Sequence, residues 1–243
     1  MITQTFIGCS GWHYEHWCGR FYPTQLPKSQ WLSYYATRFR TVELNNTFYR
    51  LPTESAVNRW AAHASPGFLF SVKGSRYVTH ILRLRECATS VETFCDRVQG
   101  LGPYLGPILW QLPPSLGRDD ALLEDFLSIL PPDLSHTIEF RHSSWWMDSV
   151  YEILRRHGVA FCLYNMEATS TPVVSTADFT YMRFHGPESR YGGRYEDSSL
   201  QEWASLLREV SARVKRVLAY FNNDANAFAV ENAEKLTTLL DVP

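Results

Sequence analysis

The chain has 243 residues, of which 45% are hydrophobic and 14% aromatic, so it is too apolar for a disordered or fibrous protein. The 25 acidic and 23 basic side chains give a net charge of −2, too little to attract a polyanion or an anionic membrane through a global field. Apolar runs are short, and residues 1–10 have neither the basic nor the apolar region of a secretory signal. We therefore expect a folded, cytoplasmic protein that does not contact membranes.

Along the chain, short segments rich in β-branched and aromatic residues alternate with longer segments of helical periodicity. The strands are predicted at residues 6–8, 41–44, 68–72, 107–111, 137–140, 159–164, 179–184 and 217–221. The helices are predicted at residues 31–39, 54–64, 85–101, 122–130, 147–157, 200–214 and 228–240. Residues 168–178 contain Pro, Ser and Thr without a helical stripe, so the sixth helix is predicted to be weak or replaced by a loop.

This alternation indicates one closed sheet. Eight strand-containing units in 243 residues give about 30 residues per unit, the size of a strand with its crossover helix. Residues 159–163 are apolar throughout, as is typical of a parallel strand that is covered on both faces. We predict one α/β domain over residues 1–243, a single (β/α)8 TIM-type barrel, with an open doubly wound sheet as the alternative.

Motifs for metals and cofactors are absent from the sequence. The five cysteines form no CxxC pair, which favours reduced thiols over disulfides or a zinc site. There is no GxGxxG segment after the first strand, no P-loop and no HExxH segment. Strands four, six and eight end in amides where a two-metal site would need carboxylates. We therefore expect neither a cofactor nor a metal.

Polar and aromatic side chains end every predicted strand. In a barrel of this type, the loops at the carboxyl ends of the strands surround the active site. Because side chains alternate along a strand, Glu43 and Asn45 are predicted to point the same way, as are Arg183 and His185. Such charges can form a structural network, but charges on several successive strands exceed what closing the barrel requires. We therefore predict a functional site there.

Several segments resemble the marker segments of the YecE-like family, a domain of unknown function of the DUF72 type. They are IGCSGWHY, FYP, VELNNTFY, the Lys73 strand followed by Thr79 and His80, LWQLPPS, IEFRHSSW, MRFHG and AYFNND. The resemblance spans nearly the whole chain and implies a TIM-type barrel with a polar, aromatic-lined mouth, but no established reaction. The matching residues are Trp12, Tyr14, Glu43, Asn45, Tyr49, Lys73, His80, Gln111, Glu139, Arg141, Trp145, Arg183, His185, Asn222 and Asn223.

Two carboxylates predict acid–base chemistry. Glu43 and Glu139 lie three strands apart and can face each other across the mouth, dividing acid and base roles. Arg141, two residues from Glu139, favours an ionised carboxylate, which suits a base better than an acid. Stacking surfaces for a sugar ring are predicted on Trp12, Trp110 and Trp145. We predict a hydrolase or isomerase with Glu43, Glu139 and His185 as its catalytic residues.

The cations predict an anionic group in the ligand. Lys73, Arg141 and Arg183 are expected to anchor a phosphate or carboxylate, and the Gly-containing loop with Arg190 and Arg194 is a predicted lid. The partner is thus a small polar or anionic, carbohydrate- or phosphate-containing ligand. Predicted ligand contacts are Trp12, Tyr14, Asn45, Tyr49, Lys73, His80, Gln111, Arg141, Trp145, Arg183, Asn222 and Asn223.

Two alternatives use the same mouth. One is endonuclease-like binding or processing of nucleic acid, because flipped bases and single strands also require cations and aromatic rings. The balanced net charge makes this alternative the weaker one. The other is a binding module without catalysis, which would tolerate the loss of Glu139.

Overall fold

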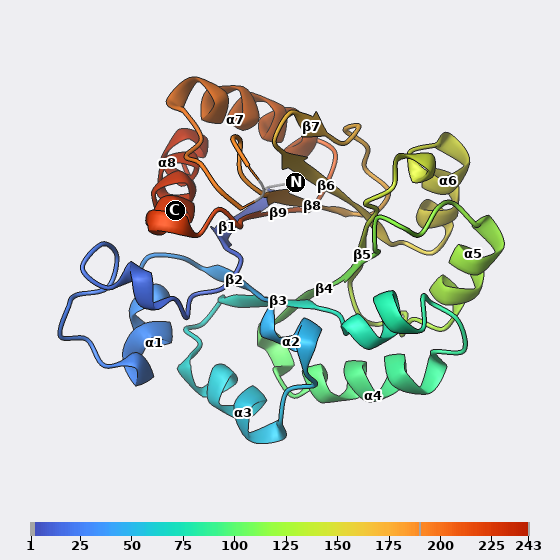
Figure 1. Cartoon of the computed structure of the whole chain (residues 1–243), viewed down its shortest axis with the longest axis horizontal. Helices are drawn as coiled ribbons and strands as arrows, with labels where there is room; N and C mark the ends of the chain where they lie inside the picture. The colour runs from blue at the N-terminus through green and yellow to red at the C-terminus, as the bar shows by residue number, and fades with distance from the viewer. Residues whose placement is uncertain (1–2, 190, 243) are drawn as a thin grey trace.

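Eight parallel strands form a closed ring with helices around its outside (Figure 1). The computed structural model describes residues 3–189 and 191–242. β1 pairs with both β2 and β9, and pairing of β5 with β6 closes the ring, which confirms the predicted barrel over the open sheet. The strands of the ring are β1 (Gln4–Cys9), β2 (Thr41–Leu44), β3 (Leu69–Lys73), β4 (Leu105–Gln111), β5 (His136–Glu139), β6 (Ala160–Met166), β8 (Phe179–Phe184) and β9 (Arg216–Phe221).

Each predicted helix has a counterpart in the structure. The helix expected at residues 31–39 already ends at Tyr35, and the short helix over residues 46–49 was not predicted. The helices are α1 (Trp31–Tyr35), α2 (Asn46–Tyr49), α3 (Glu54–His63), α4 (Ala88–Gln99), α5 (Asp120–Ser128), α6 (Asp148–Arg156), α7 (Asp197–Ser211) and α8 (Phe228–Leu240). Within residues 3–189 and 191–242, no helix has the length and apolar character needed to cross a bilayer.

The sixth unit lacks its helix, as predicted. The short strand β7 (Thr169–Ser170) folds back antiparallel on the end of β6, and an irregular segment then leads to β8. Threonine hydroxyls of this segment accept hydrogen bonds from the backbone of β6: Thr171 from Tyr164 N–H at 3.0 Å and Thr176 from Phe161 N–H at 2.7 Å. The polar residues that prevent a helical stripe therefore bond the neighbouring strand instead.

The barrel interior changes from apolar to charged along its axis. Phe6, Phe179 and Leu218 lie buried near the amino ends of their strands, within a cluster separate from the core between the strands and helices. One layer further, the Tyr220 hydroxyl is hydrogen-bonded to Thr41 and Ser71. Glutamate, arginine and lysine occupy the carboxyl ends. The fold thus gathers its buried charges at one end, which we call the mouth.

Two predicted stacking surfaces belong to the core. Trp145 is fully buried, stacks on Phe140, and donates its indole N–H to the carbonyl of Leu116 at 2.8 Å. Trp110 is also fully buried and donates to His136. The predictions that these rings face a sugar, and that Trp145 binds a ligand, are therefore wrong, because both rings fill space between the barrel and its helices.

Candidate active site

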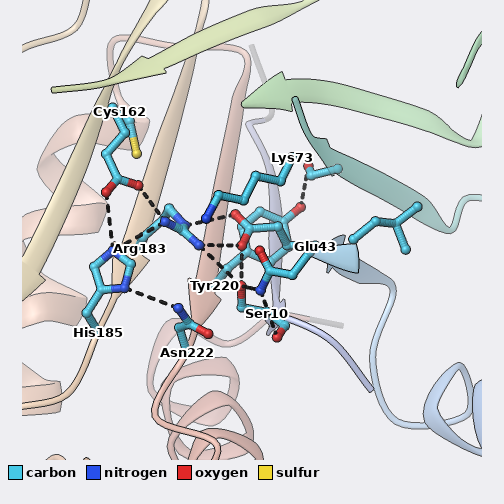
Figure 2. A network of polar contacts seen from close by, with 12 residues as sticks. Ser10, Glu43, Lys73, Cys162, Arg183, His185, Tyr220 and Asn222 are labelled. Carbon is cyan, nitrogen blue, oxygen red and sulfur yellow. Dashed lines mark hydrogen bonds and ion pairs between the residues drawn. The ribbon is translucent and has the colours of Figure 1, made fainter. Parts of the chain in front are cut away.

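Arg183 lies at the centre of the polar groups at the mouth (Figure 2). Its side chain is only 1% exposed and bonds two carboxylates. Nε lies 2.9 Å from one oxygen of Glu43 and Nη2 lies 2.7 Å from the other, while Nη1 lies 2.5 Å from Glu139. A planar guanidinium suits such paired contacts, so Arg183 joins β2, β5 and β8 across the barrel.

Glu43 has no oxygen left for a ligand proton. Besides Arg183, it accepts hydrogen bonds from the Ser10 hydroxyl and from Tyr181 at 2.7 Å, and Asn45 donates to Ser10 at 2.7 Å. Burial alone would raise the pKa of the Glu43 carboxyl, but Arg183 and the two hydroxyls outweigh it and lower that pKa. Glu43 is therefore ionised near neutral pH.

Glu139 is held in the same way. Arg141 and Arg183 both form ion pairs with it, and they outweigh the effect of burial, so its pKa lies well below the usual range. Arg141 also stacks on the Tyr164 ring, 4.8 Å from its centre. This arrangement favours an electrostatic role for the two glutamates over the predicted division of acid and base roles, because neither retains a proton at neutral pH.

His185 is a neutral imidazole in this network. Burial, with Arg183 nearby, lowers its pKa to about 3. Nε2 lies 2.7 Å from Arg141 Nη2, and an arginine can only donate, so Nε2 accepts and the ring proton resides on Nδ1. Nδ1 faces the Asn222 side-chain amide at 3.2 Å, whose oxygen can accept that proton's hydrogen bond once the amide is turned. We call Ser10, Glu43, Glu139, Arg141, Arg183 and His185 the paired network.

Lys73 lies beside this network without a partner. It is 8% exposed, and Figure 2 shows its side chain extending from β3 toward Arg183 and Glu43. Nζ lies 4.2 Å from the centre of the Phe48 ring, but no described residue accepts a hydrogen bond from it. Burial and the charge of Arg183 lower the pKa of the amine to about 7, against the pull of Glu139 and Glu43. A large share of Lys73 is therefore neutral at physiological pH.

Two unpartnered amide oxygens flank Lys73 on the neighbouring strands. Gln111 at the end of β4 is 5% exposed, and its Oε1 has no donor among the described residues. Asn45 follows β2, and its buried Oδ1 also lacks a donor there. Strands β2, β3 and β4 are consecutive in the ring. They present an acceptor, a donor and an acceptor, and we call Asn45, Lys73 and Gln111 the open arc.

A cleft of about 520 Å³ meets the open arc at Asn45, whereas Lys73 and Gln111 are not part of its lining. It lies between the loop after β1, the start of α2 and helix α3, and its lining includes Trp12, Tyr14, Asn45 and Trp60. The Trp12 and Trp60 rings meet edge to face with centres 6.3 Å apart. The structure therefore brings three of the predicted ligand contacts, Trp12, Tyr14 and Asn45, to one cleft.

Other predicted residues lie elsewhere. Tyr49 is 79% exposed and lines a separate groove with Arg50 and Arg76. His80 packs against Phe48, with Nδ1 2.9 Å from Thr79 Oγ1, and burial followed by the charge of Lys73 lowers its pKa to about 4. His80 thus contacts the same ring as Lys73.

Asn223 and Arg194 are placed outside the mouth. Asn223 is fully buried and donates to Gly193 and Asn232, so its predicted ligand contact is wrong because this amide holds the loop after β8 against α8. Arg194 is half exposed, and its Nε lies 3.5 Å from Glu231 on α8. An exposed ion pair of this length contributes little to the position of the loop, so the predicted lid stays a prediction. Arg190, the other lid residue, lies outside the described residues.

Sequence reasoning missed Tyr181. Its hydroxyl bonds Glu43, and its raised pKa, caused by burial and then by Glu43, keeps it a donor. The alternation of side chains along a strand could have identified it, because Tyr181, Arg183 and His185 are each two residues apart and therefore point the same way. Across residues 3–189 and 191–242, no group of three or more His, Cys, Asp or Glu side chains is placed to hold a metal ion.

The closed ring and the charged mouth define the chain as a TIM-type barrel protein with a candidate active site at the carboxyl ends of its strands. More narrowly, the chain belongs to the DUF72 family, since the family model described as "Protein of unknown function DUF72" matches residues 6–243. This confirms the family expected from the sequence.

Known relatives extend over the whole barrel. UPF0759 protein YunF of Bacillus subtilis (strain 168) is 26% identical, with 98% of this chain and 95% of YunF covered. The crystal structure of a DUF72 family protein from Thermotoga maritima MSB8 has a TM-score of 0.90 and 31% identity, covering 98% of this chain and 99% of that chain. A DUF72 family protein from Enterococcus faecalis V583 has a TM-score of 0.87 and 18% identity, covering 99% and 96%. The relatives establish fold and family and leave the reaction open.

Proposed function

We propose that this chain is an enzyme that performs acid–base chemistry, hydrolysis or isomerisation, on a small polar or anionic ligand at the mouth of the barrel. The observation that supports this most is the unpartnered Lys73. A lysine that served only the fold would pair with a carboxylate, yet Glu43 and Glu139 are both occupied by arginines. Lys73 is thus available to a molecule that enters the mouth.

The burial of Lys73 supports the same proposal. A buried amine without a hydrogen-bond acceptor lowers stability, because the Phe48 ring and the nearby glutamates offset only part of the cost of desolvating its charged form. An apolar side chain of similar length at position 73 would avoid that cost. Groups that lower stability in this way are typical of functional sites, where activity and stability conflict.

The roles follow from the protonation states. Lys73, with a pKa of about 7, is suited to accept or donate a proton near neutral pH, where general acids and bases work best. The free oxygens of Asn45 and Gln111 can accept hydrogen bonds from ligand hydroxyls. The paired network holds Arg141 and Arg183 in place and sets the electric field at the amine. A hydroxylated, anionic ligand matches these groups.

The test compares wild type with Lys73→Met and with Lys215→Met. Lys215 is a matched control, because it is exposed and pairs with Asp178 at 2.9 Å before β9, at the opposite end of the barrel. Each protein is incubated in D2O with ribose 5-phosphate, dihydroxyacetone phosphate or pyruvate. Proton NMR follows C–H exchange, and phosphorus NMR follows release of phosphate.

We expect wild type and Lys215→Met to convert at least one probe, and Lys73→Met to be slower by about 100-fold or more, the usual contribution of a positioned acid–base group. Equal rates in all three proteins would contradict the proposal, as would no conversion of any probe.

A further inference from the structure

A neutral, unpaired amine can act as a nucleophile as well as an acid or base. We infer that Lys73 is a nucleophile that forms an imine with the carbonyl carbon of a small hydroxylated aldehyde or ketone. This inference rests on the proposed function, because it names the substrate class and the covalent step of the same site. It is carried by the absence of any described acceptor at Nζ and by the two free amide oxygens beside it.

The contacts of Nζ leave its electron pair available. A carboxylate in hydrogen-bond contact would hold the group as ammonium, but Glu43 and Glu139 already form ion pairs with Arg183 and Arg141. The Phe48 ring faces the amine, with its centre 4.2 Å from Nζ. An aromatic face cannot accept the proton of the amine, but it stabilises a cation such as a protonated imine.

The surrounding charges have opposing effects on the pKa of the amine. From β8 and β5, Arg183 and Arg141 disfavour its protonated form, while Glu43 of β2 and Glu139 of β5 favour that form. His80, which also packs against Phe48, is neutral near pH 7. Burial adds to the effect of the arginines, and the pKa falls to about 7. A desolvated lysine next to other cations is a recognised way to activate an amine toward carbonyl groups.

The step balances without a further reactant. The Nζ electron pair forms a bond to the carbonyl carbon, and the proton lost by nitrogen balances the proton gained by oxygen. The carbinolamine hydroxyl then takes one proton from the solvent and leaves as water, while the nitrogen electron pair forms the C=N bond of a protonated imine, so nothing is oxidised or reduced. The imine withdraws electrons from the adjacent C–H bond, which makes proton removal easier and suits isomerisation. Hydroxyls on the carbon chain would donate to Asn45 and Gln111 on the neighbouring strands.

The test is reductive trapping on the wild-type protein. The chain is incubated at pH 7 with glyceraldehyde or dihydroxyacetone and cyanoborohydride, which reduces an imine to a stable amine, and peptide mass spectrometry locates the adduct. Lys28, Lys215 and Lys235 are internal controls, because each is exposed and ion-paired with an acidic side chain. We expect Lys73 to react at least 100-fold faster than these lysines, because only a small fraction of an ordinary lysine is neutral at pH 7.

The preference should shrink as the pH approaches 10, where the exposed lysines also lose their protons. Modification of Lys73 at the same rate as the exposed lysines, or no modification of it, would overturn the inference. If Lys73 is not trapped but Lys73→Met still loses proton exchange in D2O, Lys73 acts as a base alone and the proposed function stands. Lys73→Arg provides a second variant that retains a cation and should form no adduct.

Discussion

The mouth has two regions that contain similar residues and differ in how their bonds are satisfied. In the paired network, Arg183 and Arg141 occupy the carboxylates of Glu43 and Glu139. In the open arc, Lys73 lacks an acceptor and the flanking amide oxygens lack donors among the described residues. The presence of charged residues therefore does not by itself identify the ligand site. The difference indicates that the network holds the barrel together and orients the field, while the open arc meets the ligand.

The largest effect should come from breaking the paired network. Arg183→Met leaves two buried carboxylates with too few partners, so we expect a loss of about 3 to 5 kcal/mol in the free energy of unfolding at pH 7. Urea unfolding measures it. Arg156→Met removes an exposed ion pair with Glu124 and should cost less than about 1 kcal/mol. Similar losses in the two variants would contradict the structural role of the network.

A smaller effect of opposite sign is expected in the open arc. Lys73→Met should raise the free energy of unfolding by about 2 kcal/mol at pH 6, because it removes a buried amine whose pKa is lowered to about 7. Between pH 7 and about 10.5 the unfolded chain binds the proton that the folded chain has lost, so wild type gains stability and the advantage of the variant shrinks. Urea unfolding at pH 6 and pH 10 checks this. Destabilisation at pH 6 would show that Lys73 has a partner.

Replacement of Gln111 should also raise the free energy of unfolding, by less than replacement of Lys73. Gln111→Met removes an unsatisfied buried oxygen, so we expect about 1 kcal/mol of added stability by urea unfolding. The same variant should weaken binding of hydroxylated ligands, measured as a higher KM for any probe that wild type converts. A loss of stability would mean that the Gln111 amide contributes bonds to the fold.

The smallest effect is expected at the outer surface. Arg194→Ala removes a long, exposed ion pair with Glu231, so the free energy of unfolding should change by less than about 0.5 kcal/mol. Turnover of any probe should be unchanged, because no described contact joins Arg194 to the open arc. A clear drop in turnover would support the lid predicted from the sequence.

Much of this arrangement could be read from residue spacing. The alternation of strands and helices predicted the barrel, and strand period placed Glu43, Glu139 and Arg183 inside it. The same period applied to Trp110 indicates an outward ring, since Trp110 is out of phase with Gln111. Asn222 and Asn223 are neighbours, so only one of them can point into the mouth.

The partners of each charge could not be predicted. Whether Arg183 anchors a ligand or bridges two carboxylates depends on side-chain reach across a closed ring, which spacing along one strand does not contain. Trp145 ends a three-residue 3-10 helix, which is too short for a periodicity that would show whether the ring faces the core or the mouth. The unpaired state of Lys73 follows only once the partners of Glu43 and Glu139 are known.

The central claim is that Lys73 is an unpaired, titrating amine at a ligand site. The most direct measurement is the NMR titration of the Lys73 side chain in protein with ¹³C-labelled lysine, assigned with Lys73→Met. We predict a midpoint near pH 7, shifted upward by added phosphate because an anion favours the ammonium form. A midpoint near the ordinary lysine pKa, unmoved by phosphate, would contradict the account.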